Sequence, residues 1–163
     1  MTRIRNIASV ITLGAAAAFF VAGPYMAYRG VDAKNQVRAE LRAENITTPA
    51  DASIPNARVQ DDKTALAQAE VIEKHALAIT KGKTYAEMDR TDPARATAFQ
   101  ASALRTSLMA SVLAWNVANL VIGLGALVFV LGLVLLGVGL VIRKPEQVLL
   151  TTANDVRKKV VTV

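Results

Sequence analysis

The side chains that usually carry enzyme chemistry are few in this chain, and they form no recognisable motif. The only histidine is His75, and cysteine is absent, which excludes thiol nucleophiles, zinc–thiolate sites and disulfides. No H-E-x-x-H pair occurs, and one histidine is too little for a haem, copper or non-haem iron site. The sequence therefore predicts no catalytic residue, no metal ligand and no bound cofactor.

Carboxylates and glycines are numerous, but their surroundings favour structural roles. The acidic residues of the middle segment alternate with lysines and arginines, which is typical of a solvated helical surface. Gly82-Lys83-Thr84 lacks the upstream glycine of a phosphate-binding loop. Asn116 and Asn119 are polar residues in an otherwise apolar stretch, where we expect them to hydrogen-bond a partner helix or a lipid headgroup.

Two apolar runs dominate the chain and indicate its class. They cover Ile7–Tyr28 and Leu108–Ile142, and neither contains Lys, Arg, Asp, Glu or His. A membrane-spanning helix needs about 20 such residues. The sequence predicts an all-α integral membrane protein with two transmembrane helices joined by an extracytoplasmic helical segment. Since neither run holds an ionisable group, an ion or proton path is not expected.

The charge distribution predicts the orientation. The net charge is +6, yet residues 29–107 carry 12 basic and 11 acidic side chains, so the excess lies on the tails 1–6 and 143–163. Short basic flanks stay in the cytoplasm, whereas long segments cross largely regardless of charge. We expect both tails to be cytoplasmic and residues 29–107 to lie outside. Residues 7–28 should span the plasma membrane, and residues 108–142 should form the second transmembrane helix with its interfacial extension. Basic tails of this kind contact anionic lipids, and nucleic acid is not an expected partner.

The first run also resembles a secretory signal peptide. It follows a basic start and is rich in alanine, but it has 22 residues and no clear A-x-A cleavage site. Tyr25, Met26 and Tyr28 stand where small residues would be wanted. We expect a retained anchor.

The middle segment reads as helices separated by one long break. We expect Val31–Glu44 to continue the first span outward. Pro49 and Pro55 interrupt the segment Asn45–Val59. Asp62–Thr80 follows as an amphipathic helix whose predicted buried line is Leu66, Ala69, Ile72, Ala76 and Ile79.

One long helix is expected over the second apolar run and the residues before it. Asp92-Pro93 is a strong start signal, because Asp caps helices and Pro fits their first position. No proline follows until Pro145. The sequence predicts an unbroken helix over Pro93–Ile142, which would be about 75 Å long.

Small residues recur at regular spacing in both runs and predict helix packing. In the second run they are seven apart: Ser111, Ala118, Gly125, Gly132 and Gly139. In the first run they are four apart: Gly14, Ala18 and Ala22. Small faces let helix backbones approach closely in lipid. We predict that these eight residues form helix-packing interfaces, either with each other or with another subunit.

Three stretches support a family resemblance. They are AQAEVIEKHAL, KGKTYAEMDRTDPARA and ASALRTSLMASVLAWNVANLVIGLG, with LRAENITTPADA upstream. Together they resemble a family of actinobacterial two-span membrane proteins whose members are often mislabelled aromatic ring-opening dioxygenases. The resemblance covers roughly residues 41–125, and GKTYAEMDRTDP is its most specific part. It implies two spans, an outer helical segment and no established catalytic residues. Some such proteins accompany the cytochrome bcc–cytochrome oxidase supercomplex, so the resemblance suggests that complex as a partner.

Three classes of function compete at this level. The first is a non-catalytic accessory or assembly subunit of a larger membrane complex, such as a respiratory supercomplex; it fits the small-residue seams and the thin outer segment. The second is a membrane-anchored sensor or envelope scaffold, although residues 143–163 are short for an output domain. An enzyme is the third, and the missing ligands argue against it.

Overall fold

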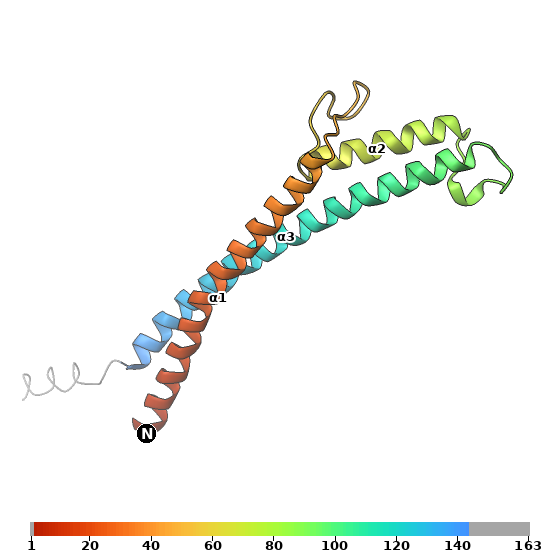
Figure 1. Cartoon of the computed structure of the whole chain (residues 1–163). Coiled ribbons are helices and arrows are strands. Elements are labelled where there is room, and N and C mark those ends of the chain that lie inside the picture. The colour runs from red at the N-terminus through yellow and green to blue at the C-terminus, as the bar shows by residue number, and fades with distance from the viewer. Residues whose placement is uncertain (1, 144–163) are drawn as a thin grey trace, which may run out of the picture. The chain divides into compact units, whose positions relative to one another are not determined.

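The computed structural model describes residues 2–143, and its described part is helical. The elements are α1 (Thr2–Ala43), α2 (Asp62–Ile79), the 3₁₀ helix η1 (Tyr85–Glu87) and α3 (Arg95–Arg143) (Figure 1). Both α1 and α3 are long and apolar enough to cross a membrane. The predicted basic tail 143–163 lies outside the described residues except for Arg143, where α3 ends.

The long helices were predicted well in extent. α1 runs without interruption through Pro24, which confirms that Val31–Glu44 continues the first run. α3 is unbroken across Gly123 and Gly125, as predicted. It begins two residues later than expected, because Asp92 and Pro93 form a capping turn in which Asp92 accepts the Ala94 N–H at 2.9 Å.

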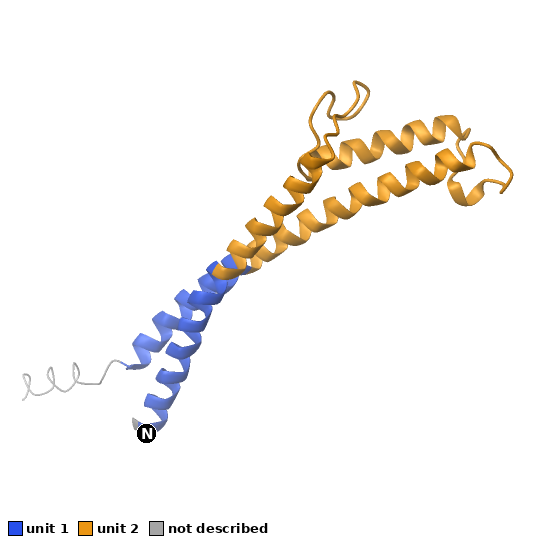
Figure 2. Ribbon diagram, viewed as in Figure 1, with its two compact units in different colours: residues 1–24, 125–163 blue, residues 25–124 orange. Residues whose placement is uncertain are grey.

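The chain divides into two compact units (Figure 2). Unit 1 holds residues 1–24 and 125–163, and its described part is the first half of α1 beside the last part of α3. The two helices are antiparallel there, since Ser9 lies at Gly139 while Ala16 lies at Gly132.

Unit 2 holds residues 25–124 and contains the hydrophobic core. Leu41 of α1, Val59 of the long loop, Ala65 and Ala69 of α2 and Leu108 of α3 form one buried cluster. Most of these side chains are small or medium in size, so the core is thin. It is nevertheless continuous across three helices and the loop.

α2 starts and stops by clear local chemistry. Asp61 caps it by accepting the Thr64 N–H at 2.9 Å, and the Thr64 hydroxyl accepts the Asp61 N–H in return. At the other end Lys81 and Gly82 both have positive φ, and the Gly82 N–H reaches back to the Leu77 carbonyl at 2.7 Å. This bond satisfies a carbonyl that the helix end would otherwise leave free.

The predicted buried line of α2 was correct only in part. Ala69 is buried and Ile72 packs against the core, as predicted, but Leu66 and Ile79 are exposed, and Ala65 and Val71 are buried in addition. The cause is side-chain size: α2 packs closely through alanines, so the larger side chains flank the contact. The prediction from hydrophobic spacing placed the larger side chains in the contact because it took no account of their size.

The segment between α1 and α2 is an ordered loop. Thr47 and Arg58 form an antiparallel bridge. The Thr48 hydroxyl, in a residue only 1 % exposed, donates to the Ile54 carbonyl at 2.5 Å and accepts the Ala57 N–H at 2.9 Å. The buried hydroxyl therefore adds to backbone hydrogen bonds that close the same loop, in which the Thr48 N–H donates to the Ala57 carbonyl and the Val59 N–H to the Ile46 carbonyl.

Candidate helix-packing interface

In unit 1 the two helices meet through residues with almost no side chain. A Cβ added to Gly23 would lie 2.7 Å from the Gly125 carbonyl oxygen and 2.8 Å from Phe129. A Cβ on Gly132 would lie 3.3 Å from the Ala16 carbonyl oxygen. These distances leave no room for larger side chains, so backbone touches backbone.

Two further contacts close this interface. The Ser9 hydroxyl, which is buried, donates to the Gly139 carbonyl oxygen at 3.2 Å. The Phe20 and Phe129 rings pack with their centroids 4.6 Å apart and tilted by 58°. An aromatic pair of this geometry flanks the glycine contact and adds directional packing.

Close contact through small residues recurs in unit 2, and further along the helices it gives way to contacts between large side chains. A Cβ on Gly30 would lie 2.8 Å from the Ala118 carbonyl oxygen, so the small seam continues. Beyond it, Trp115 is buried and has two cations near its ring: Lys34 Nζ lies 4.6 Å and Arg38 Cζ 5.3 Å from the ring centre. Lys34 also donates to Asn119 Oδ1 at 3.0 Å.

The predicted seam of α3 therefore lies against α1 at most of its positions. Ala118, Gly125, Gly132 and Gly139 are buried, and Ser111 is half-buried. Each of the four buried residues contacts α1 within its own unit. In this structure the first helix of the chain covers the seam at these four positions.

The predicted partner residues on α1 must be corrected. Nothing lies within 4 Å of a Cβ built on Gly14, Ala18 is exposed and Ala22 is only half-buried. The residues that do meet α3 are spaced seven apart: Ser9, Ala16, Gly23 and Gly30. The signal was in the sequence, because the period that matches α3 is seven and not four. Gly14 and Ala18 lie on the opposite side of α1.

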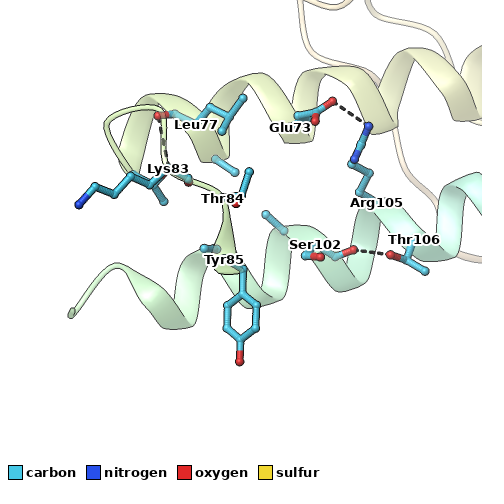
Figure 3. A pocket seen from close by; sticks show the side chains of 12 residues that line it. Glu73, Leu77, Lys83, Thr84, Tyr85, Ser102, Arg105 and Thr106 are labelled. Atoms are coloured by element: carbon cyan, nitrogen blue, oxygen red, sulfur yellow. Dashed lines mark hydrogen bonds and ion pairs between the residues drawn. The ribbon is translucent and has the colours of Figure 1, made fainter. Parts of the chain in front are cut away.

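Hollows occur in unit 2, and two of them lie between its helices. One, of about 120 Å³, lies between the end of α2 and the start of α3 (Figure 3). The Glu73–Arg105 ion pair, 2.9 Å long, stands at its edge, and the side chains of Lys83 and Tyr85 point away from the other labelled residues. The second hollow is a groove where α1, α2 and α3 meet. Gln68 Oε1 borders it and is buried without a hydrogen-bond partner in the described part of the chain.

The titratable groups of the outer loops are engaged in local structure. Hydrogen bonds from Lys74 and His75 lower the pKa of the exposed Asp51 to about 2. The backbone and hydroxyl of Thr84 lower the pKa of Glu87 by closing a capping box. Within residues 2–143 no three His, Asp or Glu side chains gather as a metal site would require.

Comparisons with known proteins add no relative. The chain matches no family model, no curated protein and no solved structure. The contacts between α1 and α3 are therefore the features of this chain that bear on its function.

Proposed function

We propose that this chain is a non-catalytic accessory or assembly subunit of a larger membrane protein complex and acts through helix packing. Residues 7–28 and the apolar part of α3 cross the plasma membrane, with both termini cytoplasmic and residues 29–107 outside. The orientation is supported by the basic excess on the two tails.

The observation that carries the proposal is the unused small face of α1. α3 packs against Ser9, Ala16 and Gly23, so Gly14 and Ala18 on the opposite side remain open. Small residues four apart allow close approach of a second helix in lipid, where packing and not hydrophobicity drives association. Because α1 already packs closely against α3 through glycines, it can present this opposite face to another subunit in a fixed orientation.

The partner suggested by the sequence resemblance is a respiratory assembly, the cytochrome bcc–cytochrome oxidase supercomplex. Such a partner would supply integral membrane helices at the depth of Gly14 and Ala18. Anionic lipids on the cytoplasmic side of the membrane would contact the basic tails.

Co-purification in mild detergent tests the proposal. Gly14→Leu and Ala18→Leu should reduce the recovery of partner subunits, because the added side chains push a neighbouring helix away; overpacking typically costs about 1–3 kcal/mol. Ala17→Leu is the matched control, since Ala17 is exposed about 100° around the helix. Partner recovery equal to wild type in both Gly14→Leu and Ala18→Leu would mean that lipid covers this face and that the proposal is wrong.

Topology has a separate test, which the absence of native cysteine makes simple. Ser53→Cys should react with a membrane-impermeant thiol reagent in intact cells, and Thr162→Cys should not. The reverse labelling pattern would invert the orientation.

A further inference from the structure

The groove where α1, α2 and α3 meet has room for a ligand. Its volume is about 620 Å³, which is within the range of known binding sites. Leu41 and Leu108 in its lining belong to the buried core, and Ile72 packs against that core. Leu104 adds an apolar side chain that is 57 % exposed. The groove therefore offers apolar contact that the described part of the chain leaves uncovered.

One edge of the groove carries negative charge. Glu40 and Glu44 line it from α1, and their spacing of four residues places them on one face. Neither carboxylate forms an ion pair within residues 2–143. Ionised carboxylates only accept hydrogen bonds, and like charges four residues apart oppose each other. A cationic group placed between the two would relieve this repulsion, so the edge favours a basic occupant.

Gln68 adds an acceptor from α2. Its Oε1 atom is buried, yet it has no hydrogen-bond partner in the described part of the chain. Buried polar groups are normally hydrogen-bonded, and leaving one unpaired is unfavourable. Rotation of the amide exchanges its oxygen and nitrogen, so a donor brought into the groove can pair with the oxygen. Gln68 and the two carboxylates thus share a need for hydrogen-bond donors.

The position of the groove argues against lipid and against a second copy as the occupant. Glu40 is 12 residues past Tyr28, where the first apolar run ends, or about 18 Å along the helix. Acyl chains do not extend to that level, and the carboxylates repel anionic headgroups. A second copy offers no basic excess there, because residues 29–107 carry 12 basic and 11 acidic side chains and the excess lies on the tails.

We propose that this groove binds a basic amphipathic helix from the extracytoplasmic part of another subunit. The proposal rests on the accessory role and the topology stated under "Proposed function", and it names the chemistry of the partner. The helix lays its apolar side chains on Leu104 and Ile72, as amphipathic helices do in apolar grooves. A Lys or Arg of that helix reaches Glu40 and Glu44, where a charge-assisted hydrogen bond is stronger than a neutral one.

A designed peptide tests the charge selection on the purified chain in phosphatidylcholine nanodiscs. The probe is a fluorescent helix with leucines on one face and lysines on the other, and its binding is followed by anisotropy against empty nanodiscs. Glu40→Lys should raise the dissociation constant at least about tenfold. Glu70→Lys makes the same change in charge on the side of α2 away from Gln68 and should leave the constant unchanged.

Two results of the peptide experiment would overturn the proposal. One is an equal dissociation constant in Glu40→Lys and Glu70→Lys, which would place the peptide elsewhere. The other is equal binding of a matched helix in which every lysine is replaced by glutamate, which would leave the carboxylates without a role.

Photocrosslinking in native membranes identifies the occupant, and the absence of native cysteine allows a single label. A benzophenone attached to Ser107→Cys, in the groove lining, should link to a segment of a different membrane protein that carries net positive charge, as read by mass spectrometry. The same label on Met109→Cys, on the opposite side of α3, should not reach that segment. No crosslink, or one to lipid, to a second copy or to an acidic segment, overturns the proposal.

These tests are separate from that of the accessory role. Neither involves Gly14 or Ala18. If the groove fails both tests while Gly14→Leu and Ala18→Leu still lose partner subunits, only the groove proposal is refuted.

Discussion

The two units join the same pair of helices by different means. In unit 1 the helices meet mainly backbone to backbone, with Gly23 against Gly125 and Gly132 against Ala16. In unit 2 one such contact, Gly30 against Ala118, is joined by a core of larger side chains that includes Leu41 and Leu108, and by Trp115, which has two cations near its ring. The contrast suits the proposed surroundings. Helices in lipid gain nothing from burying apolar groups and associate by close packing, whereas helices in water gain most from burial.

This comparison implies that removing atoms should damage unit 2. Leu108→Ala should have the largest effect, lowering the free energy of unfolding by about 2–5 kcal/mol, because it empties part of a thin core shared by three helices. Leu104→Ala is the control, since Leu104 is 57 % exposed. The stability of both variants can be compared by amide hydrogen exchange of α2 in the detergent-solubilised protein. Equal protection in the two variants would show that the core does not hold α2.

Adding atoms should damage unit 1. Gly23→Ala should cost about 1–3 kcal/mol, because the new methyl group collides with the backbone of α3. Gly14→Ala adds the same methyl in open space and should be neutral or slightly stabilising, since alanine favours helix over glycine by about 1 kcal/mol. Unfolding of each variant by a denaturing detergent, followed by circular dichroism, gives the difference. If both behave alike, the helices in unit 1 do not touch through Gly23.

An effect of similar size is expected in the loop of unit 2, where one buried hydroxyl adds to the backbone hydrogen bonds. Thr48→Val keeps the shape but removes the hydroxyl that serves Ile54 and Ala57. Buried backbone groups left without partners cost about 1–3 kcal/mol. Protease cleavage within residues 49–57 should accelerate in Thr48→Val and not in Thr48→Ser, which retains the hydroxyl. Resistance equal to wild type in Thr48→Val would assign loop closure to the backbone alone.

The smallest effect concerns charge on the exposed surface of unit 2. The pKa of Asp51 is depressed to about 2 by hydrogen bonds from Lys74 and His75. A depressed folded pKa means that this contribution to stability is present above the ordinary Asp value and is lost as pH falls through about 2. Asp51→Asn should therefore flatten the acid limb of the stability curve slightly, as read from hydrogen exchange of the loop. If the acid limb of Asp51→Asn matches that of the wild type, the contacts of Asp51 with Lys74 and His75 contribute nothing to stability.

Local signals were sufficient to predict the helices. Asp92 as a cap, Pro49 and Pro55 as breaks, and the proline-free stretch to Ile142 gave α3 and the loop nearly correctly. The thin core and the seam of α3 followed from residue size and spacing. The choice of face on α1 and on α2 did not, because each helix offers more than one apolar or small stripe and only a partner in space selects among them.

The sequence by itself determined two long apolar helices, a polar segment between them, and the heptad of small residues in α3. These depend on composition and period, which are local properties. Only the tertiary structure decided that Ser9, Ala16 and Gly23 meet that heptad and that Gly14 and Ala18 do not. Only the structure set Lys34 beside Asn119. Which faces touch, and at what register, depends on the fit of two surfaces, and no single helix carries that information.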